Sequence, residues 1–216
     1  MSSSSQVRCS TLKPIDKLLN STPGHWNMPS SSVKCGVCPR RVLDIGCAAR
    51  ANVIIPTLCF NGHEVWGIDV RPWNYKHPDF HFVRGDARHM EFQDKWFDVV
   101  YDVSAIEHFG LAGRYSVADS DPDADKKAVA QIYRVTKPEA MFLSTKPYGP
   151  FYRIEGSFQR VYDREHIKML FYGWRLEEAL LLGENGVASY KDYPQANDKC
   201  VLCVKLYKEK VSQKHD

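Results

Sequence analysis

The stretch RVLDIGCAARAN, from Arg41 to Asn52, and the segment VWGID that ends at Asp69 decide the fold. Together they predict a buried strand, a tight turn, a helix and a second strand that ends in an acid. In an open parallel sheet, ligands bind beyond the carboxyl ends of the strands, and an acid at the tip of the second strand can accept hydrogen bonds from ribose hydroxyls. The pattern therefore predicts an α/β nucleotide-binding unit in which Asp69 holds a ribose.

The turn after the first strand separates two classes of nucleotide-binding protein. A dinucleotide-binding turn reads G-x-G-x-x-G, and its glycines let the backbone approach a pyrophosphate. This chain instead has Asp44 two positions before Gly46 and lacks the spaced glycines, which disfavours a nicotinamide-dependent oxidoreductase. The turn resembles motif I of the class I S-adenosylmethionine (SAM) dependent methyltransferases, where it lies against the methionine part of the cofactor.

Further segments follow in the order typical of that superfamily. FHFVRGDAR predicts a third strand that ends at Asp86 and Ala87, where the resemblance implies contact with adenine. DKWFDVVYDVSAIEHFG predicts a fourth strand that leads into the polar residues Ser104, Glu107 and His108. The apolar spacing in the segment 125–136 predicts a helix, which the dipeptide KP ends before a fifth strand.

A narrower resemblance rests on four short motifs, IEHFGLAGRYS, DADKKAVAQIYRV, KPYG and FQRVYD. They are similar to the signature of methyltransferases that accompany polysaccharide and natural-product genes. The match runs from about Arg41 to Lys208. It implies SAM as the cofactor and a small-molecule acceptor, such as a sugar.

The resemblance implies an α/β, Rossmann-like fold. Its sheet is expected to have seven strands and to be mostly parallel with an antiparallel last strand, and helices should cover both faces. The last two strands should form a hairpin with a long loop, and Asp163 should cap the helix that precedes them. The expected strands are Arg41–Ile45, Glu64–Asp69, Phe80–Arg84, Phe97–Val103, Ala140–Thr145, Trp174–Leu182 and Lys199–Tyr207.

Length and composition fit one domain with short appendages. A chain of 216 residues with 44% hydrophobic content has the size of a single α/β domain. We expect this domain to span residues 41–208, with a C-terminal tail at 209–216. The N-terminal extension, residues 1–40, should be partly disordered and contain a short helix at Thr11–Asn20.

Charge, hydropathy and cysteine content exclude several classes of function. The formal net charge is only +3, so binding to nucleic acid is not indicated. The sequence has neither an apolar membrane span nor a secretory signal, which favours a cytoplasmic protein. The pairs Cys35/Cys38 and Cys200/Cys203 could supply four zinc ligands, but residues three apart on a strand point to opposite faces. We therefore expect no metal and reduced thiols.

Residues of the expected cofactor site follow from the resemblance, and two of them depart from it. Small residues, usually glycine, are typical where this chain has Ala48 and Arg50, and the usual Lys-Pro-Gly-Gly turn here has Glu139 and Ala140. Ala48 implies either ordinary right-handed backbone or weakened cofactor binding, while Arg50 could pair with the carboxylate of the cofactor. The full expected set is Asp44, Gly46, Cys47, Ala48, Arg50, Asp69, Asp86, Ala87 and Ser104.

His108 and Glu107 are the candidate catalytic residues. Methyl transfer is an in-line displacement, so the protein must hold donor and acceptor together and remove a proton if the acceptor is a hydroxyl. His108 follows the fourth strand, and histidine is the residue type that titrates near neutral pH, although a packing role beneath the cofactor is the alternative. Glu107 could instead order the loop. Two further groups of residues stand out. A set of acids suits a solvated helix entry better than a metal site (Asp119, Asp121, Asp123, Asp125), and a mixed aromatic and cationic set suits a lid over a polar acceptor (Tyr152, Arg153, Arg160, Tyr162).

The sequence thus predicts a SAM-dependent methyltransferase that acts on oxygen of a sugar or another small molecule. The departures at Ala48, Arg50 and Glu139 keep open an alternative, a degenerate SAM-binding protein without catalysis.

Overall fold

The computed structural model describes residues 40–48, 54–113, 120–183 and 186–209. The expected N-terminal helix, Arg50, Asp119 and the pair Cys35/Cys38 lie outside these ranges. Everything below concerns the described part of the unit that runs from Pro39 to Asp216.

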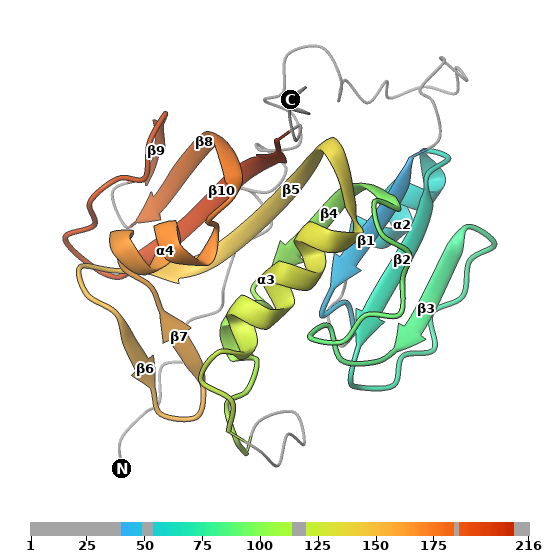
Figure 1. Ribbon diagram of the computed structural model, residues 1–216, viewed down its shortest axis with the longest axis horizontal. Helices are drawn as coiled ribbons and strands as arrows, with labels where there is room; N and C mark the ends of the chain where they lie inside the picture. The colour runs from blue at the N-terminus through green and yellow to red at the C-terminus, as the bar shows by residue number, and fades with distance from the viewer. Residues whose placement is uncertain (1–39, 49–53, 114–119, 184–185, 210–216) are drawn as a thin grey trace, which may run out of the picture. The chain divides into compact units, whose positions relative to one another are not determined.

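An eight-stranded sheet with the order β3-β2-β1-β4-β5-β10-β8-β9 forms the centre of this unit (Figure 1). The pairs among β1 to β5 are parallel, whereas β10 pairs antiparallel with both β5 and β8. The antiparallel strand near the chain's end is thereby confirmed. The strands are β1 Arg41–Ile45, β2 Glu64–Asp69, β3 Phe80–Arg84, β4 Phe97–Val103, β5 Thr136–Tyr148, β8 Trp174–Gly183, β9 Gly186–Tyr190 and β10 Cys200–Lys208.

The sheet has one strand more than the seven expected. β9, Gly186–Tyr190, lies within the segment expected to be a loop between the last two strands and pairs only with β8. All five of its residues are exposed, so its sequence lacks the alternation of apolar and polar residues that marks a half-buried strand. A small second sheet, the β6 (Arg153–Glu155) and β7 (Gln159–Val161) hairpin, was also not expected.

Helices cover both faces of the large sheet, as expected. In Figure 1, α3 (Ala124–Val135) and α4 (Arg164–Leu170) lie on the viewer's side, and α2 (Ile54–Phe60) lies behind β2. Right-handed crossovers place helices on both faces, because the side on which a crossover helix lies depends on the direction in which the chain moves across the sheet. The chain moves in one direction from β1 to β2 and in the other from β4 to β5. None of the helices in the described ranges is long and apolar enough to cross a membrane.

Two sequence signals mark helix ends correctly. Asp163 caps α4, since its Oδ1 accepts a hydrogen bond of 2.9 Å from the backbone N–H of His166. α3 ends at Val135, and the KPEA turn follows as an irregularity at the start of β5. In that turn Glu139 has a φ of +62°, a conformation that glycine adopts more easily.

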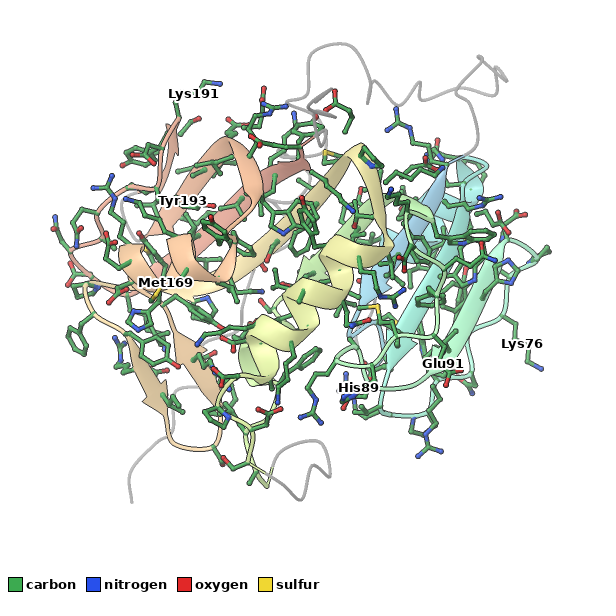
Figure 2. All side chains as sticks on the ribbon, viewed as in Figure 1. Lys76, His89, Glu91, Met169, Lys191 and Tyr193 are labelled. Atoms are coloured by element: carbon green, nitrogen blue, oxygen red, sulfur yellow. The ribbon has the colours of Figure 1, made fainter. Side chains whose placement is uncertain are left out.

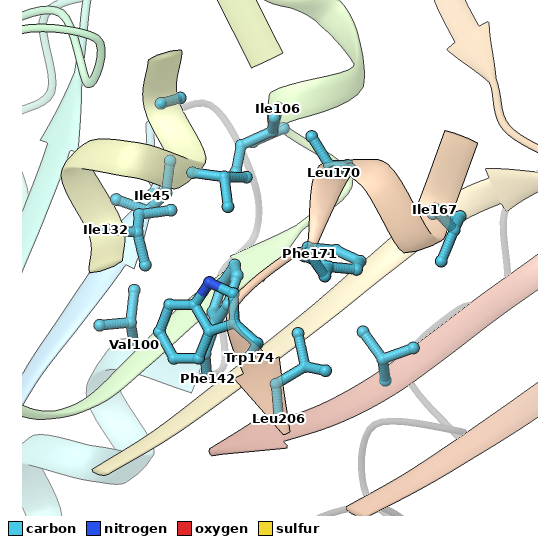
Figure 3. Close-up of a cluster of buried hydrophobic side chains, with 14 of the residues drawn as sticks. Ile45, Val100, Ile106, Ile132, Phe142, Ile167, Leu170, Phe171, Trp174 and Leu206 are labelled. Carbon is cyan, nitrogen blue, oxygen red and sulfur yellow. The ribbon is translucent and has the colours of Figure 1, made fainter. Parts of the chain in front are cut away.

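The largest apolar core lies between the sheet and the α3 and α4 face (Figure 3). α3 contributes Ile132, β5 contributes Phe142, and Trp174 begins β8 with its ring centroid 5.0 Å from that of Phe142. Charged groups at the surface point outward instead, as Lys76 and Lys191 do in Figure 2. The packed core fixes the strand ends, and with them the loops that carry the polar residues.

The strand order changes direction between β1 and β4. Strands β2 and β3 follow on one side of β1, and β5 lies on the far side of β4. At such a switch point the loops beyond the carboxyl ends diverge and leave a crevice, which is where open α/β sheets bind ligands.

Candidate active site

A cavity lies at this switch point, and its walls come from the loops that follow β1, β2, β3 and β4. Six of the predicted cofactor residues and the predicted base therefore come together at one place. The lining residues are Gly46, Ala48, Ile68, Asp69, Val70, Arg71, Gly85, Asp86, Ala87, Arg88, Ser104, Ala105, His108, Phe109 and Gly110.

Gly46 makes the turn after β1 possible. Its φ is +69°, and a Cβ added there would lie 2.5 Å from the Cβ of Ala105. The next small position, Ala48, does not have a positive φ, and its N–H donates a 2.9 Å hydrogen bond to Asp69 Oδ2. The sequence left two possibilities for Ala48, ordinary backbone or weakened cofactor binding, and the structure has ordinary backbone at this residue.

Asp69 is held from two sides. Besides the Ala48 N–H, it accepts hydrogen bonds from Arg71, with Nε 3.0 Å from Oδ1 and Nη2 2.8 Å from Oδ2. Arg71 also donates to the Ala48 carbonyl at 2.5 Å. The side chain of Asp69 is only 3% exposed. A ribose that binds Asp69 must therefore take the place of part of the Arg71 guanidinium.

Asp86 shows the same arrangement one strand further on. Arg88 Nη2 lies 2.6 Å from Asp86 Oδ2, and Arg88 Nη1 lies 2.9 Å from Asp121 Oδ2. Burial raises the pKa of Asp86, but hydrogen bonds from the side chain and backbone of Arg88 outweigh it, so the pKa lies below its usual value. Asp86 is therefore a carboxylate at neutral pH.

Two expected cofactor residues stay behind the cavity wall. Asp44 and Cys47 are both buried, and neither belongs to the described residues that line the cavity. Burial, followed by the charges of Asp44 and Asp69, raises the pKa of the Cys47 thiol far above its usual value. Cys47 is thus a neutral packing residue, and a Cβ at Gly67 would lie 2.6 Å from its sulfur.

Ser104 ends β4 in a strained conformation. Its φ is +49°, although it carries a side chain. The Ser104 N–H donates a 3.0 Å hydrogen bond to Thr145 Oγ1 in β5, and the two hydroxyls lie 3.3 Å apart. Non-glycine residues in this region of backbone space persist where the surroundings hold them, often at functional sites.

His108 and Glu107 follow in the 3-10 turn η1 (Ile106–His108). His108 Nδ1 lies 2.6 Å from the carbonyl oxygen of Phe158, in the β6–β7 hairpin. Its Nε2 lies 3.7 Å from Glu107 Oε1. Glu107 is almost completely buried, and its Oε2 lies 3.4 Å from the ammonium of Lys146. The carboxylate therefore stands between a lysine and the imidazole.

The expected lid is only partly a surface feature. Arg160 and Tyr162 are buried and cannot reach an acceptor. The Arg160 guanidinium donates to the carbonyls of Phe109 at 2.5 Å and Asp121 at 3.2 Å, and Tyr162 donates to Asp125 at 2.8 Å. A guanidinium can join several carbonyls at once because it has five donors. The FQRVYD motif thus fixes the loop that carries His108.

The acidic helix entry is less solvated than expected. Asp123 is exposed, but Asp125 is buried against Tyr162, and Asp121 pairs with Arg88 and Lys127. Within the described residues, no three or more metal-ligating side chains gather in a way that could hold an ion.

Sequence reasoning missed three residues of the site. Arg71 and Arg88 each follow a predicted cofactor acid by two positions, so the repeated pattern D-x-R at two strand ends was available as a signal. Lys146 gave no signal, because a lysine in a strand normally reads as a solvent-facing residue.

Comparison with known proteins agrees with this geometry. Residues 43–144 match the model of a methyltransferase domain family. A search of curated proteins gave no match.

Solved structures of similar fold come from several sources. One is a Burkholderia thailandensis 1,6-didemethyltoxoflavin-N1-methyltransferase with bound 1,6-didemethyltoxoflavin and S-adenosylhomocysteine, 15% identical over 80% of this chain and 72% of that chain, with a TM-score of 0.56. Another is a SAM-dependent methyltransferase from Methanosarcina mazei, 14% identical over 79% of this chain and 93% of that chain, with a TM-score of 0.55. A third is the [4+2]-cyclase SpnF, 14% identical over 79% of this chain and 76% of that chain, with a TM-score of 0.56.

At these identities the solved structures establish the fold, and the family match adds the domain type. Residues 43–144 of this chain thus match a methyltransferase domain, and the chain shares its fold with SAM-dependent methyltransferases.

Proposed function

We propose that the protein transfers the methyl group of SAM to an oxygen atom of a small-molecule acceptor, such as a sugar hydroxyl. The observation that carries this proposal is the cavity at the switch point, because Asp69, Asp86 and His108 all line it. One acid can bind the ribose and the other the adenine of an adenosine, and a histidine can remove a proton from an acceptor.

The residues present fit the cofactor. Asp69 would accept hydrogen bonds from the ribose hydroxyls, and Asp86 with Ala87 would hold the adenine. The turn at Gly46 and Ala48 would lie against the methionine part. Small residues at Gly46, Gly85 and Ala87 leave room on the wall. Arg50, the proposed partner of the cofactor carboxylate, lies outside the described residues.

His108 would remove the proton of the acceptor. The Phe158 carbonyl can only accept a hydrogen bond, so it keeps a proton on Nδ1 and leaves Nε2 to act as the base. When bound, the cofactor supplies an electrophilic methyl group on a sulfonium. The contribution of the protein is to orient the two reactants and to take up the proton at Nε2.

Calorimetry with SAM, S-adenosylhomocysteine and NAD tests the assignment of the cofactor. We expect the first two to bind and NAD not to bind, and Asp69→Ala should weaken SAM binding by about 1 to 3 kcal/mol, the usual loss when a polar group loses its partner. Glu64→Ala serves as the control, because that half-buried acid of β2 is not among the residues that line the cavity. Binding of NAD without binding of SAM would overturn the proposal.

A second candidate function is SAM binding without methyl transfer. The observation that favours it is the arginine on each cofactor acid, because Arg71 and Arg88 compete with a ligand for Asp69 and Asp86. The neighbour SpnF, whose structure is described as a [4+2]-cyclase, has the same fold. Incubation with SAM labelled on the methyl group and a panel of sugars and other hydroxyl compounds separates the two functions, because only a transferase moves the label.

A further inference from the structure

Four ionisable side chains form a connected chain beneath the cavity. Lys146 in β5 is completely buried, and its ammonium contacts the carboxylate of Asp102 and donates to the Thr145 carbonyl at 3.0 Å. The same ammonium lies 3.4 Å from Glu107 Oε2. Glu107 in turn reaches His108, the residue on the cavity wall.

Both carboxylate oxygens of Asp102 have hydrogen-bond partners. Its Oδ1 accepts from the N–H groups of Ala105 at 3.3 Å and Ile106 at 3.2 Å, and its Oδ2 accepts from Ser144 Oγ at 2.7 Å in addition to Lys146. Asp102 therefore fixes both the 3-10 turn and the lysine. Lys146, placed in this way, fixes the carboxylate of Glu107.

The net charge of these four side chains is zero when His108 carries a proton on each ring nitrogen. With Asp102, Glu107 and Lys146 ionised, these three groups have one negative charge in excess. Nδ1 of His108 faces a carbonyl oxygen and Nε2 faces the Glu107 carboxylate, so both nitrogens face acceptors. A buried carboxylate favours the charged form of a neighbouring base.

Among the described residues, two other cations near His108, Arg160 and Arg88, are paired elsewhere. Arg160 in β7 lies 3.4 Å from the Glu107 carbonyl oxygen, and its charge is opposed by Asp125 at 3.6 Å. Arg88 lines the same cavity and is paired with Asp86 and Asp121.

We infer that Glu107, held by Lys146, is the positioning residue that makes His108 a proton-holding group, and that His108 exchanges this proton for the positive charge of SAM. This inference rests on the proposed function. The sulfonium of SAM has a permanent positive charge, and two cations in one buried space repel each other strongly. His108 therefore releases its Nε2 proton to solvent when SAM binds, and becomes the neutral base that the reaction needs.

The proton balance then closes over the reaction. His108 Nε2 takes the hydroxyl proton as the acceptor oxygen bonds to the methyl carbon and the carbon–sulfur bond breaks. The products are the methyl ether, S-adenosylhomocysteine, which has no sulfonium, and a protonated His108. The site returns to its starting charge.

Calorimetry in two buffers of different ionisation enthalpy measures the protons released on binding. SAM and S-adenosylhomocysteine have the same adenosine and amino acid groups, so a difference between them reports the sulfonium. We expect SAM to release more protons near pH 6.5, His108→Asn to abolish the difference, and Glu107→Gln to reduce it. The matched control Glu165→Gln, an exposed acid of α4, should leave the difference unchanged. Equal proton release for the two ligands by the wild-type protein would overturn the inference.

A second measurement is independent of the cofactor. Proton NMR of the cofactor-free protein follows the ring signals of His108, assigned with His108→Asn, as the pH is raised. We expect Glu107→Gln to move the titration to lower pH, while Glu165→Gln leaves it in place; an unmoved titration would contradict the role of Glu107. If SAM does not bind at all, the proposed function fails and this titration still decides the role of Glu107. If Glu107→Gln does not fold, the comparison of the two ligands on the wild-type protein decides.

Discussion

At Gly46 the turn after β1 passes so close to Ala105 that a side chain does not fit. Gly46→Ala combines a positive φ with a steric clash, so we expect a loss of about 2 to 4 kcal/mol in the free energy of unfolding. Gly62→Ala is the matched control, because Gly62 also has a positive φ, +79°, but nothing within 4 Å of an added Cβ. It should cost only about 1 kcal/mol. Urea unfolding measures both, and equal losses would show that the contact with Ala105 is unimportant.

Arg71 covers the acid that we assign to the ribose. Arg71→Ala removes the guanidinium hydrogen bonds from both Asp69 oxygens and a cation from the cavity, so we expect SAM to bind several-fold more tightly. Arg84→Ala controls for charge alone, because Arg84 contacts the Val70 carbonyl and lies outside the cavity lining. Calorimetry provides the affinities. Weaker binding by Arg71→Ala than by Arg84→Ala would mean that Arg71 holds the cofactor.

Single residues of the site were predictable to different degrees. Asp69 and Asp86 could be found because strands in an α/β pattern place their last residues at one edge. The roles of Lys146 and Arg160 could not, since burial of a charged side chain depends on partners far away in the chain, such as Asp102 for Lys146 and the Phe109 carbonyl for Arg160. Nothing in a local pattern reports such partners.

At the scale of elements, the β6–β7 hairpin is tied to the segment before β10 by one acid. Glu155 contacts Arg153 at 2.9 Å and Lys199 at 2.5 Å. Partial burial raises the pKa of Glu155, but hydrogen bonds from Lys199, Gln159 and Arg153 outweigh it and lower the pKa to about 2. Because the folded pKa lies below the usual one, this stabilisation is complete above about pH 4.5 and is lost as the pH falls toward 2.

Hydrogen exchange of the hairpin amides checks this pH dependence. Protection of β6 and β7, relative to that of β1, should fall as the pH is lowered from about 4.5 toward 2 in the wild-type protein. Glu155→Gln should show lower protection that no longer changes over this range. A mutant that keeps the wild-type pH dependence would assign the effect to another acid.

Elements with a buried face were predicted well, and exposed ones were not. The bounds of β1, β2, β3 and β4 match the expected strands to the residue, and α3 matches to within one. These segments carry apolar residues at the period of their element. β9 was missed because all five of its residues are exposed, so no apolar period marks it, and it pairs with β8 at the edge of the sheet.

At the scale of the molecule, cofactor binding should stabilise the whole unit. A ligand that binds only the folded state at about 100 times its Kd adds about 2.7 kcal/mol to the free energy of unfolding. We expect SAM to raise the midpoint of thermal unfolding and NAD to leave it unchanged. Asp69→Ala should lose most of the SAM effect at the same concentration. An equal rise in wild type and mutant would place SAM elsewhere.

The expectation of a mostly parallel sheet with an antiparallel last strand came from the resemblance, and the residue pattern gave no strand order. Hydrophobic periodicity predicts that strands exist, whereas their order depends on contacts between distant segments, such as those of β10 with β5. Handedness rules reduce the choices but do not select one. The extra edge strand β9 lies at the end of the sheet opposite β3 and leaves the switch point unchanged.

The two D-x-R pairs also bear on how the protein exists before it meets a ligand. Each acid on the cavity wall has its counter-charge within its own turn, so neither carboxylate is uncompensated when no ligand is bound. We therefore expect the protein to fold without the cofactor. If Asp69 and Asp86 bind SAM as we propose, the same pairs must open first, which lowers the affinity for SAM. The fraction of protein with SAM bound would then follow the SAM concentration instead of remaining at saturation.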